Sequence, residues 1–165
     1  MIVELGKGLA LTFRHLFRRP ITVQYPEEKV PMVPGHRGLH KLMRYEDGPY
    51  AAMERCIGCK LCQAACPVDC IYIESAENTP ENRVSPGERY ASVYEINELR
   101  CIYCGFCEEA CPTDAIILGE AYEFSKYSRD TMIYTKDMLL APPPENPPAG
   151  PEPKGATVPL GGRRV

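Results

Sequence analysis

The chain has 165 residues, a net charge of −3 and nine cysteines, but no tryptophan. With 17 prolines and 13 glycines, so short a chain is a poor match to a conventional enzyme with a large apolar core, because small domains bury a limited fraction of their surface. Residues 1–50 carry eight Lys or Arg against five Asp or Glu, whereas residues 51–119 carry five against eleven. The excess of acidic residues in 51–119 argues against nucleic-acid binding by this segment. The excess of basic residues in 1–50 is suited to contact with an anionic membrane or an acidic partner.

Residues 1–19 have the pattern of an amphipathic helix. Apolar side chains recur there at helical spacing; they are Leu5, Leu9, Phe13, Leu16 and Phe17. Arg14, Arg18 and Arg19 follow them, which is the wrong order for a secretory signal, and Pro20 ends the helix. Two interpretations stay open: a helix packed on its own domain, or an interfacial helix along a membrane or a membrane subunit.

No stretch of the sequence approaches the roughly 18 apolar residues that a membrane-spanning helix needs. We therefore expect a cytosolic chain whose cysteines are reduced and available as metal ligands. The odd number of cysteines, nine, agrees with this expectation.

Two segments are rich in proline and glycine. Residues 20–50 are too interrupted for regular secondary structure, so we expect an irregular linker packed on partners. Residues 141–165 contain eight prolines and four glycines, and we expect an extended tail there. A disordered end without a role and a tail that wraps a partner are both open for this segment.

The centre of the chain contains an internal repeat with a spacing of 45 residues. Both copies read C-x2-C-x2-C-x3-C-P, the pattern of bacterial ferredoxins. The first copy holds Cys56, Cys59, Cys62 and Cys66, and the second holds Cys101, Cys104, Cys107 and Cys111. Structural zinc sites use pairs of ligands with a longer gap between the pairs, so the triplet and its proline favour iron–sulfur clusters.

Two [4Fe-4S] clusters are therefore the expected cofactors. Because the fourth cysteine of each run serves the other cluster in two-cluster ferredoxins, we expect crossed ligation. Cluster one takes Cys56, Cys59, Cys62 and Cys111, and cluster two takes Cys101, Cys104, Cys107 and Cys66. Gly58 and Gly105 are expected to let the backbone approach the clusters closely. The ninth cysteine, Cys70, stands where the second copy has Ala115 and is interpreted as a buried structural thiol.

Short strands are expected around the two motifs, at 51–54, 71–74, 92–96 and 116–118. With a helical turn after the fourth cysteine of each motif, they predict an α+β fold: a two-cluster, bacterial ferredoxin-like core at residues 51–119, with a pseudo-twofold repeat of short hairpins. Residues 75–90 form a connection longer than this fold requires. Residues 120–140 are a C-terminal extension.

Other kinds of site are missing from the sequence. It contains neither a dinucleotide-binding fingerprint nor a phosphate-binding P-loop, and it shows no nucleophile–base constellation, so we assign no catalytic residue. His15, His36 and His40 have no ligand spacing, and we expect them to be solvated or locally hydrogen-bonded. The chain is expected to carry electrons.

The segments that flank the cysteine motifs resemble those of a known protein family. From about Arg18 to Leu140, the chain resembles the family of subunit I of the proton-pumping NADH:quinone oxidoreductase, respiratory complex I. Besides the cysteine motifs, the segments that carry the resemblance are 20–28, 37–40, 54–59, 100–112 and 134–140. The tail at 141–165 is not part of it.

The resemblance implies that two [4Fe-4S] clusters relay single electrons from the NADH side towards quinone. The chain would then be one subunit of an enzyme, a translocase of the respiratory chain, whose other subunits oxidise NADH and reduce quinone. Its implied partners are complex I subunits of the peripheral arm and of the membrane-arm junction. It would be a peripheral protein on the cytoplasmic side of the inner membrane, with the helix at 1–19 at the membrane end. The alternatives are a ferredoxin-like subunit of a related membrane hydrogenase or other quinone-linked complex, and a free soluble ferredoxin.

Overall fold

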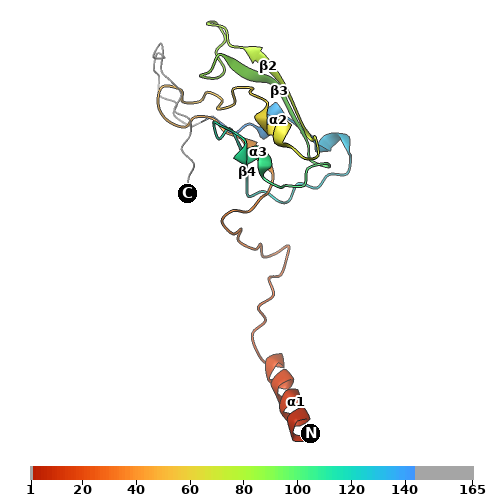
Figure 1. Ribbon diagram of the computed structural model, residues 1–165. Helices are drawn as coiled ribbons and strands as arrows, with labels where there is room; N and C mark the ends of the chain where they lie inside the picture. The colour runs from red at the N-terminus through yellow and green to blue at the C-terminus, as the bar shows by residue number, and fades with distance from the viewer. Residues whose placement is uncertain (1, 144–165) are drawn as a thin grey trace. The chain divides into compact units, whose positions relative to one another are not determined.

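The computed structural model describes residues 2–143 of the chain. The chain divides into two compact units, Met1–Val33 and Pro34–Val165. The first contains α1 (Ile2–Leu16), which agrees with the helical spacing of the apolar residues (Figure 1). No residue of α1 is buried, and Phe13 contacts Phe17 edge to face with ring centroids 5.2 Å apart. Among the residues described, no helix has the length and apolarity to span a bilayer.

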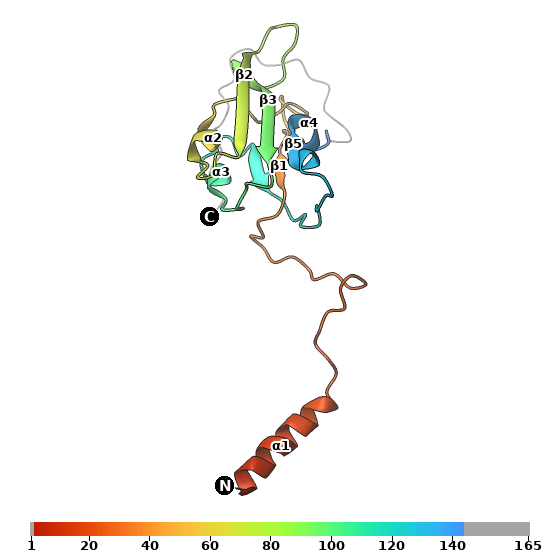
Figure 2. The same cartoon turned by 90° about the vertical axis from the view of Figure 1, so that its right-hand side faces the viewer.

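The second unit contains two small antiparallel sheets. β1 (His40–Leu42) pairs with β4 (Ile116–Leu118) in a two-stranded sheet. The other sheet has the order β2 (Ile71–Glu77), β3 (Arg89–Asn97), β5 (Ile133–Thr135), and Figure 2 shows these three strands side by side. The short helices are α2 (Leu61–Ala65), α3 (Phe106–Glu109) and α4 (Lys136–Leu139), and Asp130–Met132 form the 3-10 turn η1. α2 and α3 lie before the fourth cysteine of each motif, and not after it as predicted.

Three of the four expected strands lie inside β2, β3 and β4, but the entry to the first motif differs from the prediction. Residues 51–54 form turns, with one bridge between Glu54 and Arg44. A strand that was not expected, β1, lies inside the segment predicted to be irregular, and it pairs with β4, the strand that follows the second motif. β1 is only three residues long, so its sequence shows no usable alternation, and it exists because β4, far along the chain, provides its hydrogen-bonding partner.

The core of this unit is small and contains cysteines. Apolar side chains from both sheets and from α4 pack together in it; they are Leu42, Ile71, Ile73, Ala91, Tyr94, Ile96, Ile116, Tyr134 and Leu139. Cys62, Cys70 and Cys107 belong to the same cluster. One thiol of each motif therefore lies within the core, and Cys56, Cys66, Cys101 and Cys111 pack against it, whereas Cys59 is exposed.

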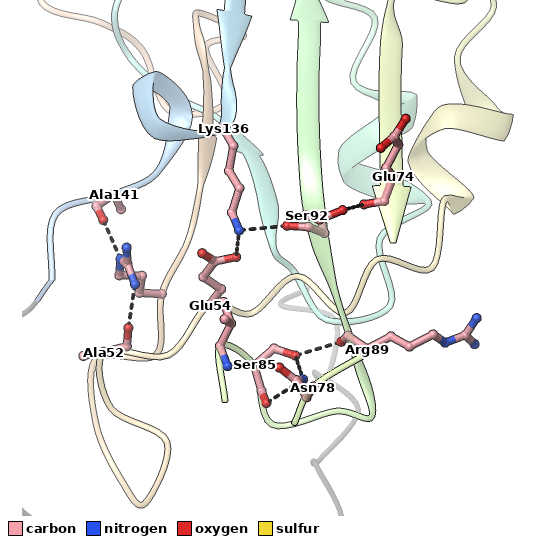
Figure 3. Close-up of polar contacts among 12 residues, drawn as sticks. Ala52, Glu54, Glu74, Asn78, Ser85, Arg89, Ser92, Lys136 and Ala141 are labelled. Atoms are coloured by element: carbon pink, nitrogen blue, oxygen red, sulfur yellow. Dashed lines mark hydrogen bonds and ion pairs between the residues drawn. The ribbon is translucent and has the colours of Figure 1, made fainter. Parts of the chain in front are cut away.

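The connection between β2 and β3 is shorter than expected, because the two strands extend into it. The remaining loop is held by Asn78, whose amide donates to the Ser85 carbonyl at 3.1 Å and to the Ser85 hydroxyl at 2.9 Å. The Ser85 hydroxyl in turn donates to the Arg89 carbonyl at 2.8 Å (Figure 3). Side-chain to backbone bonds of this kind give the loop a defined conformation.

The C-terminal extension at 120–140 packs on residues 51–119. β5 adds a third strand to the sheet of β2 and β3, and Leu139 of α4 is buried. Lys136 pairs with Glu54 at 2.9 Å and donates to the Ala91 carbonyl at 2.8 Å (Figure 3). The folded unit thus begins before residue 51 and continues beyond residue 119. The predicted tail at 141–165 lies outside the described residues except for 141–143.

Candidate metal centres

Two cavities lie within the second unit, and each is lined by four of the cysteines of the two motifs. The first is lined by Cys56, Cys59, Cys62 and Cys111. The second is lined by Cys66, Cys101, Cys104 and Cys107. In both, three cysteines come from one motif and the fourth from the other motif. These are the same two sets that the expected crossed ligation requires.

The rest of each lining is mainly apolar. Leu42, Ile57, Ile73, Tyr94 and Ile116 surround the first set of thiols, and Val68, Ile71 and Ile102 contribute to the wall of the second. Four thiol donors around an apolar cavity match the ligand preference of iron–sulfur clusters, which are held by cysteine thiolates. The residues present in both cavities therefore fit a [4Fe-4S] group.

The backbone of each motif turns twice through the left-handed region. Gly58 and Tyr103 occupy the same place in the two motifs, with φ of 63° and 52°. Lys60 and Gly105, two residues further on, have φ of 63° and 85° and precede α2 and α3. Each motif thus has one glycine at one of these two turns and an ordinary residue at the other. At Gly58 the backbone also lies so close that a Cβ atom would be 2.8 Å from the Tyr90 carbonyl oxygen.

Backbone N–H groups point at several of the sulfurs. The N–H of Ala115 donates to the Cys111 sulfur at 3.2 Å, and that of Cys70 donates to the Cys66 sulfur at 3.5 Å. The N–H of Tyr103 donates to the Cys101 sulfur at 3.3 Å. Such bonds favour the thiolate, the form of cysteine that binds metal.

Burial and hydrogen bonding act on the thiols in opposite directions. Burial raises the pKa of the Cys56 thiol to about 12, and it raises the pKa of Cys62 against the effect of a hydrogen bond to Tyr94. Burial also acts to raise the pKa of Cys66, but N–H bonds from Cys70 and Val68 lower it by more. Binding of metal at the buried thiols therefore includes the loss of their protons.

His40 is the site residue that the sequence prediction missed. Instead of being solvated or locally hydrogen-bonded, it is 2% exposed and lines the second cavity. Its Nδ1 lies 3.0 Å from Glu98 Oε1 and its Nε2 lies 3.9 Å from the Cys101 sulfur. Burial acts to lower the pKa of His40, but hydrogen bonds to Cys101, Cys107 and Glu98 raise it to about 11. Spacing could not have revealed this, because His40 and Cys101 are 61 residues apart.

The other histidines lie elsewhere. His15 is an exposed residue of α1, and the His36 ring contacts the Tyr122 ring edge to face, with centroids 6.3 Å apart. The ninth cysteine, Cys70, is buried as expected. Its sulfur lies 3.4 Å from that of Cys66, at the edge of the second cavity, a contact that the sequence prediction did not include.

Comparison with known proteins agrees with the geometry. Residues 55–115 match the family model described as "4Fe-4S dicluster domain". Among solved structures, the chain is similar to one chain of the membrane-bound sulfane sulfur reductase, an archaeal respiratory membrane complex, with 29% sequence identity and a TM-score of 0.47. That match covers 73% of this chain and 55% of the other chain, so this chain spans little more than half of that relative. The protein is a small mixed helix and sheet protein with a ferredoxin-like 4Fe-4S dicluster domain.

Proposed function

We propose that the chain binds two [4Fe-4S] clusters and transfers single electrons between partner proteins. Cysteines 56, 59, 62 and 111 hold cluster one, and cysteines 66, 101, 104 and 107 hold cluster two. The observation that carries the proposal is the pair of separate cavities, each lined by three cysteines of one motif and the fourth of the other. A bound cluster supplies one-electron redox chemistry at each cavity.

The protein's own contribution is to hold and shield the two groups. Apolar side chains of both sheets keep water away from the sulfurs, and N–H groups of the motif backbones bond to sulfur. Because each motif gives its fourth cysteine to the other cavity, the two halves are crosslinked through metal. We propose that the two halves form a pseudo-twofold pair, in which β1 and β4 of one half correspond to β3 and β2 of the other. Cluster binding then contributes directly to folding stability.

We further propose that this electron carrier is a subunit of a membrane-bound respiratory complex of the NADH:quinone oxidoreductase type. Two features support this: the resemblance outside the cysteine motifs, and the helix α1, which carries arginine near its end and has no buried residue. In this proposal α1 lies along the membrane or a membrane subunit, on the cytoplasmic side of the inner membrane. Oxidation of NADH and reduction of quinone belong to partner subunits.

Anaerobic purification of the tagged full-length chain from membranes tests both the proposed binding of two clusters and the proposed membership of a membrane complex. We expect about eight Fe per chain, an equal amount of acid-labile sulfide, and co-purification of subunits that bind NADH and quinone. Zinc without sulfide would overturn the cluster assignment. Recovery as a soluble monomer with its full iron content would overturn the membrane-complex assignment and leave a free ferredoxin. Co-purification with hydrogenase subunits would identify the related membrane complex instead.

A further inference from the structure

One polar residue of a sheet lines each cavity, Tyr94 the first and His40 the second. Tyr94 on β3 is paired with Ile73 on β2, and His40 on β1 is paired with Leu118 on β4. Ile73 and Leu118 are themselves separated by the 45-residue spacing of the repeat. Tyr94 and His40 therefore occupy matching positions, one beside each cavity, although no similarity between their flanking sequences reveals it.

Tyr94 contacts the first cavity. It is 1% exposed, and its hydroxyl lies 3.3 Å from the sulfur of Cys62. Among the described residues, this is the one side-chain hydroxyl within hydrogen-bond distance of the sulfur of Cys56, Cys59 or Cys62; the fourth sulfur of the set, that of Cys111, lies 3.7 Å from the Thr113 hydroxyl. Because Tyr94 is buried, its hydroxyl can stabilise negative charge on the Cys62 sulfur more strongly than a solvated group could.

His40 contacts the second cavity in a different way. Its Nε2 lies 3.9 Å from the sulfur of Cys101, and its Nδ1 lies 3.0 Å from Glu98 Oε1. The side chains of His40 and Glu98 are 1% and 0% exposed. The Tyr103 hydroxyl donates to Glu98 Oε2 at 2.8 Å, and the Tyr103 ring stacks on the imidazole with centroids 5.7 Å apart. The imidazole is thus held from two sides.

The first motif has no counterpart of this arrangement. The residues 45 positions before Glu98 and Tyr103 are Met53 and Gly58, which have neither a carboxylate nor a hydroxyl. A buried imidazole–carboxylate pair therefore lies next to one set of ligands, whereas the hydroxyls of Tyr94 and Thr113 lie next to the other. Hydrogen bonds to sulfur and local charge are the protein's means of setting a cluster's reduction potential.

We propose that Tyr94 and His40 are matched positioning residues that give the two clusters different reduction potentials. Tyr94 acts on cluster one through Cys62, and His40, held by Glu98 and Tyr103, acts on cluster two through Cys101. This rests on the proposed binding of two clusters by the full chain. The inference adds one positioning residue for each cluster, so that the reduction potential of one cluster can be changed without changing that of the other.

Potentiometric EPR titration of the anaerobically purified full chain tests the proposal, with iron content measured on each sample. Tyr94→Phe removes one hydroxyl and keeps the ring, and we expect the midpoint potential of one cluster to fall while the other stays unchanged. His40→Phe removes the imidazole near the Cys101 sulfur and leaves the Tyr103 hydroxyl as the remaining side-chain partner of the Glu98 carboxylate beside cluster two, so we expect the other midpoint potential to fall. A tenfold change in a one-electron equilibrium, the size expected for one hydrogen bond to a charged sulfur, is about 59 mV.

Two further variants keep the test decisive. Tyr103→Phe retains the ring beside His40 but removes the bond to Glu98, and we expect it to move the same potential as His40→Phe by a smaller amount. It serves in place of His40→Phe if that variant does not fold. Tyr72→Phe is the matched control, because Tyr72 is half exposed on β2 and its hydroxyl bonds Glu74; neither potential moves.

The outcomes separate this inference from the proposed function. Iron-loaded variants with unchanged potentials, or Tyr94→Phe and His40→Phe variants that move the same potential, would overturn the roles of Tyr94 and His40 and leave the two clusters in place. An unmodified chain without iron and sulfide would overturn the proposed function itself.

Discussion

Lys136 attaches the C-terminal extension to the ferredoxin core, and its replacement by methionine is a direct test of that attachment. The ammonium lies 2.9 Å from Glu54 Oε2 and 2.8 Å from the Ala91 carbonyl oxygen, and it also lies 5.2 Å from the centre of the Tyr90 ring. The side chains of Lys136 and Glu54 are 16% and 6% exposed. Lys136→Met keeps most of the aliphatic stem and removes all three polar contacts.

The expected loss of stability follows from the burial of the pair. Removing one partner of a buried ion pair costs about 3–5 kcal/mol, because the remaining charge is left uncompensated. Lys136 keeps some contact with water, so we expect the lower end, about 3 kcal/mol. For a chain of this size, each kcal/mol corresponds to about 2–4 °C in the midpoint of thermal unfolding. The midpoint of Lys136→Met should therefore fall by about 6–12 °C.

Thermal unfolding of the anaerobic, cluster-loaded chain, followed by circular dichroism at one fixed scan rate, measures this shift. Lys126→Met is the matched control, because Lys126 is an exposed lysine of the same extension and its loss should change the midpoint little. The double variant Glu54→Gln with Lys136→Met should be more stable than Lys136→Met alone, since no buried charge remains unpaired. A fall of the unfolding midpoint by less than about 2 °C, as for an exposed ion pair, would refute the reasoning. So would a double variant in which the effects of the two substitutions on the midpoint are strictly additive.

Three other predictions address the sites and the N-terminal helix. Cys111→Ala should remove the EPR signal of the cluster held by the first motif's three cysteines; loss of the second motif's signal alone would mean that ligation is not crossed. Deletion of residues 1–19 should leave the iron content unchanged and reduce the fraction of chain recovered in the membrane complex on a sucrose gradient, and unchanged recovery would disprove the role of α1. Gly58→Ala should destabilise the chain by about 1–3 kcal/mol in thermal unfolding, because its Cβ would contact the Tyr90 carbonyl. Gly48→Ala, with φ also positive but open space around it, should cost less, and equal costs would show that the close contact is unimportant.

Much of the metal-binding chemistry could be predicted before the structure was known. The two C-x2-C-x2-C-x3-C-P runs indicated iron–sulfur clusters, and the model of a 4Fe-4S dicluster domain matches the same region. β2, β3 and β4 were predicted because each contains a run of β-branched or aromatic residues long enough to show a preference. The burial of Cys70 was predicted from Ala115, its counterpart in the repeat.

β1 and residues 51–54 were predicted wrongly for one shared reason. The three residues His40–Leu42 have no local strand signal, and they form a strand because β4 pairs with them. Residues 51–54 have suitable composition, but they pair with the segment before them only through the bridge of Glu54 to Arg44, and the rest forms a turn and a bend. A short strand depends on the tertiary structure, which places its partner beside it, more than on its own propensity.

The candidate metal ligands could be recognised in the sequence, because cysteine spacing is a local property of the chain. What surrounds those cysteines depends on the tertiary structure. Pairing of β1 with β4 places His40 beside Cys101, and pairing of β3 with β2 places Tyr94 beside Cys62. Such contacts join residues far apart in the chain, and side chains of unlike type fill the matching positions. No spacing rule could have connected them, since the contacts exist only once the two sheets have formed and packed around the thiols.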